Sequence, residues 1–156
     1  MTQRSGCRKS WKMREGSNKM IGKELTLCAA TEGLRQKTFS SVELTQSVLD
    51  AIREKDGELN AYLNVDEDGA LQQAAAADAA RAAGRDGDLL GIPLALKDAI
   101  SVAGQPCSCA SKMLAGYVAP YDATVSARLR AAGAVFAGRT NMDEFAQTSF
   151  FTKQTV

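Results

Sequence analysis

The stretch GIPLALKD, residues 91–98, decides how the rest of this sequence is interpreted. Its apolar centre, residues 92–96, follows Gly91 and precedes a charged pair, which predicts a short buried strand. Lys97 stands at the end of that strand. Burial disfavours the charged form of lysine and can lower its pKa to roughly 5 to 6. Because a neutral amine can accept a proton, Lys97 is a candidate general base.

The same lysine has a purely structural interpretation. Lys97 and Asp98 could form a solvated pair at the edge of a sheet, with no chemical role. A motif of eight residues does not decide between the two interpretations. The residues outside this motif are needed to choose between the two interpretations.

The composition indicates one globular domain. The chain has 156 residues, of which 45% are hydrophobic and 24% charged, as in ordinary folded domains. Its net charge of +1 hides an asymmetry, because residues 1–20 hold six of the 19 Lys and Arg and one of the 18 acids. The remaining chain is mildly acidic and lacks a broad basic footprint for nucleic acid, so any RNA contact is expected to be local or supplied by a partner.

The absence of histidine excludes several kinds of catalytic site and metal site. No Ser-His-Asp or Cys-His arrangement, and no zinc site that uses histidine, can form within this sequence. Cys107 and Cys109 are two positions apart, which is poor spacing for a metal or redox pair, so we interpret them as small, partly buried residues in a reducing compartment. No apolar run suits a membrane span or a secretory signal, which favours a cytoplasmic protein.

Four segments are expected along the chain. Residues 1–19 are a basic leader predicted to be disordered, and residues 20–88 form a helical segment. Residues 89–148 begin an α/β core, and residues 149–156 are a divergent tail.

Capping signals predict two helices in the helical segment, and composition predicts a third. Thr26 caps a helix to about residue 37, with Leu27, Ala30 and Leu34 on one side, and Ser40 with Glu43 forms a capping box for a second. The second helix ends near residue 56, residues 61–65 are extended or a connector, and an alanine-rich helix covers residues 67–83.

The core segment reads as strand, loop, helix and strand, which favours a parallel pair. Asp122 is the expected cap of a helix over residues 123–132, with Val125, Leu129 and Ala132 inward. The second strand covers residues 134–137, and Thr140 with Asp143 caps a further helix start. Four acidic residues are better explained by turns and caps than by metal binding: Asp98, Asp122, Asp143 and Glu144. Four aromatic residues are expected in core or contact positions rather than in a base-stacking platform: Tyr117, Tyr121, Phe136 and Phe145.

Several collinear blocks resemble the amidase signature family. They are GIPLALKD, CASK at residues 109–112, PYDATVSARLRAAGAV at 120–135 and GRTNMDEFA at 138–146. FSSVELTQSVLDAI at 39–52, LNAYLNV at 59–65 and RAAG at 81–84 are further similar to the A subunit of aspartyl/glutamyl-tRNA amidotransferases. The resemblance covers about residues 25–146.

The resemblance implies a fold and a reaction. The fold would be α/β, the N-terminal part of the amidase signature fold with a mixed sheet between helices. The mechanism would use a serine nucleophile, a second serine and a neutral lysine, and Lys97 matches that lysine. The full-length subunit would release ammonia from glutamine and associate with B and C subunits. The partner B subunit would use ATP and magnesium to amidate misacylated tRNA, so no cofactor or metal is expected in this chain.

The sequence departs from the family pattern in two places. After residue 146 it reads QTSFFTKQTV, where the family has a serine-rich segment and then both catalytic serines with the oxyanion hole. We therefore expect a truncation or frameshift and no glutaminase activity from this chain alone, and Ser149 is not a nucleophile candidate. Ala99 stands where an asparagine is usual. Two other functions stay open: a fragment of a stand-alone amidase that hydrolyses small amides, and a binding module without catalysis.

Overall fold

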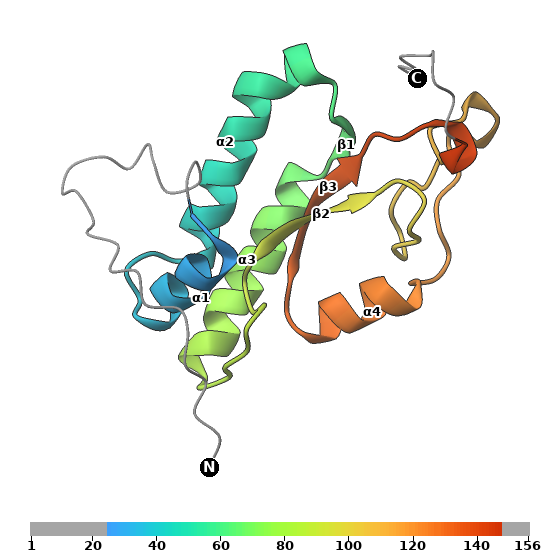
Figure 1. The fold of residues 1–156 in the computed structure, drawn as a ribbon. Coiled ribbons are helices and arrows are strands. Elements are labelled where there is room, and N and C mark those ends of the chain that lie inside the picture. Colours follow the sequence, from blue (N-terminus) through green and yellow to red (C-terminus); the bar gives the residue numbers. More distant parts are fainter. Residues whose placement is uncertain (1–24, 148–156) are drawn as a thin grey trace.

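The structure is a computed structural model that describes residues 25–147. The expectations for residues 1–19 and 149–156 lie outside this range. The elements follow one another along the described chain as shown in Figure 1: α1 (Leu27–Arg35), α2 (Ser41–Leu59), β1 (Tyr62–Val65), α3 (Glu67–Ala82), β2 (Pro93–Lys97), η1 (Lys112–Leu114), α4 (Thr124–Ala131), β3 (Val135–Thr140) and η2 (Glu144–Ala146).

A three-stranded mixed sheet forms the centre of the described fold. Its order is β1-β3-β2, with β3 parallel to β2 and antiparallel to β1. The predicted parallel pair and the predicted α/β class are both confirmed. The third strand is β1, from the segment that the sequence left open as extended or a connector.

Helices pack against both faces of the central strand β3. Ala70 and Ala74 of α3 pack against Val135 of β3 on one face, and α2 lies alongside α3 (Figure 1). On the other face, Leu129 of α4 packs against the cluster that contains Phe136 of β3. The small alanine side chains of α3 let that helix lie close to the central strand.

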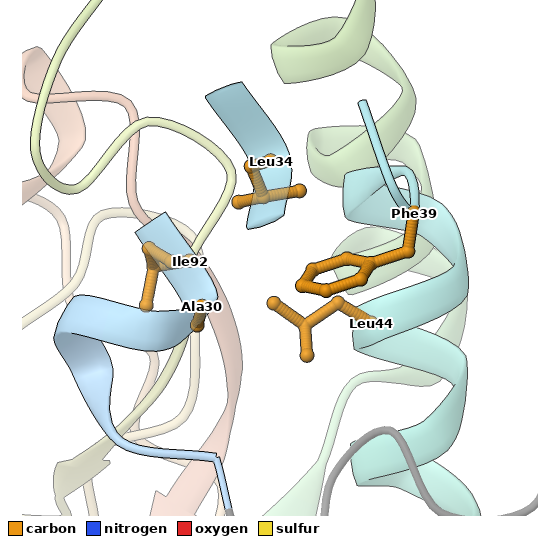
Figure 2. Packing of buried hydrophobic residues seen from close by; sticks show 5 residues of the cluster. All are labelled: Ala30, Leu34, Phe39, Leu44 and Ile92. Atoms are coloured by element: carbon orange, nitrogen blue, oxygen red, sulfur yellow. The ribbon is translucent and has the colours of Figure 1, made fainter. Parts of the chain in front are cut away.

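The first two helices form a core of their own with the start of the core segment. Ala30 and Leu34 of α1 meet Phe39, Leu44 of α2 and Ile92, as Figure 2 shows. The backbone at Gly91 packs tightly against Ser41 at the start of α2. Gly91 has a φ of +75°, and a Cβ there would lie 2.7 Å from the Ser41 hydroxyl oxygen, which donates to the Gly91 carbonyl at 2.7 Å.

Both predicted N-caps of the helical segment are confirmed. The Thr26 side chain accepts from the Ala29 amide, and the Ser40 and Glu43 side chains form a complete capping box. These bonds satisfy amide groups that the first helical turn leaves without partners. Leu27, expected on the inner side of α1, is exposed instead.

Replacing Ser40 by alanine is expected to lower the free energy of unfolding by about 1 kcal/mol, because the Glu43 amide loses its acceptor. Chemical denaturation followed by circular dichroism measures this change. Ser47→Ala on the same helix is the control and is expected to have a smaller effect, since Ser47 caps no helix end. An equal loss in both variants would contradict the importance of the capping box.

Two capping predictions in the core segment are wrong. Helix α4 has Ala123 at its N-cap with no side-chain bond, because the Asp122 carboxylate accepts from the Ala103 amide at 2.8 Å and pairs with Arg130 at 3.1 Å. Val125 of this helix is exposed rather than inward. The predicted helix start near Asp143 is only the short 3₁₀ helix η2, and its Asp143 N-cap makes no side-chain bond. Thr140 belongs to β3.

Candidate functional site

The carboxyl ends of the two parallel strands lie side by side and define the candidate site. Lys97 is the last residue of β2 and is opposite Thr140, the last residue of β3. The Asp98 amide extends this pairing by donating to the Thr140 carbonyl at 3.1 Å. Open α/β sheets bind ligands outside the carboxyl ends of their strands, so this edge is where chemistry is expected.

The Lys97 side chain projects from an open face of β2. Ala95 and Lys97 are exposed, whereas Leu96 and Asp98 are buried, as expected for side chains that alternate along a strand. Among residues 25–147, no hydrogen bond or ion pair reaches the Lys97 amine. The described residues therefore leave Lys97 exposed. None of the elements in residues 25–147 covers the Ala95 and Lys97 side of β2.

Asp98 points the other way and is buried. One carboxylate oxygen accepts from the Ser108 amide at 2.9 Å, the Ser108 hydroxyl at 2.6 Å and the Ala110 amide at 3.4 Å. The other oxygen faces Arg139 Nε at 3.5 Å. The idea of a solvated Lys97–Asp98 pair is thus wrong. The interpretation of Asp98 as a turn residue is confirmed, because its carboxylate organises the loop that follows β2.

Arg139 is a site residue that the sequence analysis did not identify. It is in β3 with only 1% of its surface exposed, and it donates from Nη2 to the Ile100 carbonyl. Its Nε and Nη1 make no hydrogen bond in the described structure, although Nε is close to the Asp98 carboxylate. A signal was present in the sequence: Arg139 directly follows the apolar residues 134–138, and the parallel pairing places it opposite Leu96.

Two backbone segments with unusual conformations meet beside this pair. Cys109, Ala110, Phe145 and Ala146 all have positive φ angles between 49° and 57°. They are linked because the Phe145 amide donates to the Cys109 carbonyl at 3.0 Å. The buried Ser111 hydroxyl also donates to Glu144 at 2.6 Å. Such backbone strain is concentrated at functional sites in proteins, which agrees with placing the site here.

The cysteines and acidic residues of the described part of the chain do not gather into a metal centre. Within residues 25–147, no group of three potential ligands from His, Cys, Asp or Glu comes together. Cys107 is buried and donates from Sγ to the Asp98 carbonyl, and Cys109 is partly buried. Burial raises the pKa of the Cys109 thiol, helped by the neighbouring Cys107. Both residues fit the expected role as small, partly buried side chains.

Of the four aromatic residues singled out from the sequence, one is in the core. Phe136 is almost fully buried, whereas Tyr117, Tyr121 and Phe145 are exposed on the described structure.

None of the helices described here has the length and apolar character needed to cross a membrane.

The fold and the site described above agree with the protein family that the sequence comparison identifies. A family profile described as amidase matches residues 43–155, so the chain belongs to the amidase family. The match extends past residue 146, where we expected the resemblance to end. The predicted membership of the amidase signature family is confirmed.

Within this family, the chain is similar to A subunits of glutamyl-tRNA(Gln) amidotransferases. The chain is 53% identical over 126 residues to the A subunit of glutamyl-tRNA(Gln) amidotransferase from Pseudomonas entomophila (strain L48), covering 81% of this chain and 26% of the relative. It is 54% identical over 125 residues to the corresponding protein of Azotobacter vinelandii (strain DJ / ATCC BAA-1303), with 80% and 26% coverage. The chain therefore spans about a quarter of the length of the curated relatives that it matches.

Solved structures of amidases share the fold. The native peptide amidase from Stenotrophomonas maltophilia superposes with a TM-score of 0.74 at 38% identity, covering 78% of this chain and 26% of that enzyme. An amidase family protein from Bacillus anthracis str. Ames gives a TM-score of 0.72 at 29% identity, with 77% and 24% coverage.

Proposed function

We propose that this chain supplies the lysine-bearing part of the glutaminase subunit of a tRNA-dependent amidotransferase. The observation that carries the proposal is its 53% identity to an amidotransferase A subunit over 81% of the chain. The position of Lys97 at the carboxyl end of a parallel strand, with an amine free of described partners, is compatible with a role as proton acceptor.

In the proposed reaction, a serine attacks the side-chain amide of glutamine and passes its proton through a second serine to the Lys97 amine. The proton later leaves with ammonia as the C–N bond breaks, so the lysine acts as base and then as acid. Water then hydrolyses the glutamyl–serine ester, which releases glutamate and restores the serine. The described residues supply the lysine and the loop that follows it. B and C subunits, misacylated tRNA, and the ATP and magnesium used by the B subunit belong to the complete assembly that we propose.

A chimeric protein tests this role directly. The matching quarter of the Pseudomonas relative is replaced by the matched residues of this chain, and the chimera is purified with its B and C subunits. Glutamine-dependent ammonia release is expected from the chimera, and Lys97→Met is expected to lower kcat by at least about a thousandfold, as for loss of a catalytic base. The 156-residue chain alone is the negative control.

Lys112→Met is the matched control variant. Lys112 is also exposed and lies close to the site in the loop after β2, but it has no assigned role, so its loss is expected to leave kcat nearly unchanged. A folded chimera without activity, or a Lys97→Met chimera with full activity, would refute the proposal.

The second candidate is a stand-alone amidase. It is favoured by the TM-score of 0.74 with a peptide amidase. Co-purification separates the two: retention of the B subunit by the chimera, at the level of the parent Pseudomonas protein, supports the amidotransferase. Hydrolysis of small amides by a chimera that does not retain the B subunit supports the amidase.

A further inference from the structure

We propose that Ser111 and Glu144 are positioning residues: their hydrogen bond sets where the chain after residue 147 begins, relative to the end of β2. This inference rests on the proposed function, in which β2 carries Lys97 and both serines come from the part of a complete subunit that follows residue 147. The resemblance assigned a role to Lys97 alone, so these two residues are an addition.

Two segments that are distant in the sequence meet at this hydrogen bond. Ser111 is in the loop after β2, and Glu144 begins η2 after β3. Ser111 is fully buried, and its hydroxyl donates to the Glu144 carboxylate at 2.6 Å across 33 positions of sequence. The hydroxyl oxygen also accepts from the Met113 amide at 3.3 Å, which holds it at the start of η1. Hydrogen bonds from a hydroxyl to a carboxylate are short and strong, so this contact joins the two segments firmly.

A backbone link continues from this hydrogen bond to the end of β2. The Phe145 amide donates to the Cys109 carbonyl at 3.0 Å, and the Cys109 amide donates to the Asp98 carbonyl at 3.2 Å. Asp98 directly follows Lys97 in the sequence. Two hydrogen bonds therefore connect the backbone after β3 with the backbone at the end of β2.

The backbone on both sides of this link needs support. Cys109 and Ala110 on one side, and Phe145 and Ala146 on the other, have positive φ angles between 49° and 57°. Residues other than glycine keep such angles only where the surrounding contacts fix them. The two hydrogen-bonded side chains come from the residue directly after the first pair and the residue directly before the second. They are therefore placed to hold both pairs.

The direction of the chain after residue 147 depends on this arrangement. The Gln147 amide donates to the Glu144 carbonyl at 3.1 Å, so the last described residue is tied to the same short helix. In the proposed reaction a serine has to be aligned with glutamine, and a displacement of about 1 Å can lower the rate about a hundredfold. Neither Ser111 nor Glu144 is proposed to contact glutamine. The expected effect of losing their bond is therefore on kcat and not on KM.

Amide hydrogen exchange of the 156-residue chain, followed by NMR, tests the link without any glutaminase assay. Ser111→Ala is expected to raise the exchange rate of the Phe145 amide, relative to that of the Val135 amide, by at least about tenfold. The reason is that the Phe145 bond to Cys109 opens more often, whereas Val135 donates to Ile92 on the far side of the sheet. A general loss of stability would raise both rates by the same factor and leave their ratio unchanged.

Three further variants identify the cause of the change. Glu144→Gln keeps an oxygen that can accept from Ser111, so its exchange ratio is expected to stay within about twofold of the parent. Glu144→Ala removes that oxygen and is expected to reproduce the effect of Ser111→Ala. Asp143→Ala is the control, because the neighbouring carboxylate makes no capping bond to η2, and its ratio is expected to stay near the parent value. If Ser111→Ala does not fold, Glu144→Ala decides the outcome.

The chimera described above tests the consequence for the reaction. Ser111→Ala and Glu144→Ala are expected to lower kcat for ammonia release by about tenfold to a hundredfold, with KM for glutamine within about twofold of the parent. Glu144→Gln is expected to keep the parent kcat. A purely structural pair would lower the unfolding temperature and leave kcat of the folded chimera unchanged. That result, or an unchanged exchange ratio in both alanine variants, would overturn the inference.

Failure of the proposed function has a different signature. An inactive parent chimera, or full activity of the Lys97→Met chimera, would refute the proposed function, and the positioning role would be refuted with it. Failure of the inference alone would leave the Lys97→Met chimera inactive and the Ser111→Ala chimera fully active. The two failures are therefore distinguishable.

Discussion

Replacing Arg139 by methionine is expected to lower the free energy of unfolding by about 3 to 5 kcal/mol, because it leaves the buried Asp98 carboxylate without its counter-charge. The carboxylate keeps its bonds to Ser108 and Ala110, but these do not neutralise a charge that is only 2% exposed. Urea denaturation of the chain, followed by circular dichroism, measures the change.

Two further variants distinguish the effect of burial on the free energy of unfolding from the effect of removing a charge. Arg53→Met removes an arginine whose ion pairs with Asp50 and Glu67 are exposed, so a much smaller change is expected. Asp98→Asn/Arg139→Met is expected to lose less than the sum of its single variants, since neither charge is left unpaired. Equal losses for Arg139→Met and Arg53→Met would show that the Asp98–Arg139 pair is not buried in solution.

Local signals in the sequence predicted most of the elements. The caps at Thr26 and Ser40 are formed by neighbours three residues away, so their chemistry can be read without knowing the fold. Asp122 shows where this logic fails. The same residue type stands in front of a helix, but its carboxylate is taken by Ala103 and Arg130, which only the folded loop brings within reach.

The candidate site was predictable in position but not in environment. Lys97 was identified from its place at the end of an apolar run, and the parallel pairing with β3 confirms that place. Its exposure could not be predicted, because burial depends on which elements pack over that side of β2. Arg139 was missed for a related reason: its partner Asp98 is 41 positions away by number and meets it only after the strands pair. The catalytic role of Lys97 stays a prediction.

Replacing Phe136 by alanine is expected to lower the free energy of unfolding by about 3 to 5 kcal/mol. Phe136 is only 1% exposed and packs with Leu96, Val102 and Ala134 between the sheet and α4. The ring also lies beneath the Arg130 guanidinium, with 5.4 Å between its centroid and Cζ. Its removal leaves a cavity that the paired strands cannot close, because β3 is hydrogen-bonded on both sides.

Phe145→Ala is the matched control, since it deletes the same side chain at a position that is 49% exposed. Its effect is expected to stay below about 1 kcal/mol, because the half-exposed ring buries little apolar surface and the substitution leaves the positive φ of residue 145 unchanged. Urea denaturation of both variants gives the comparison. Similar losses at the two positions would mean that the cluster around Phe136 is not the core of this face. A large difference would mean that the cluster around Phe136 stabilises this face of the sheet. Leu96 of β2 belongs to the same cluster, so the cluster also supports the backbone next to Lys97.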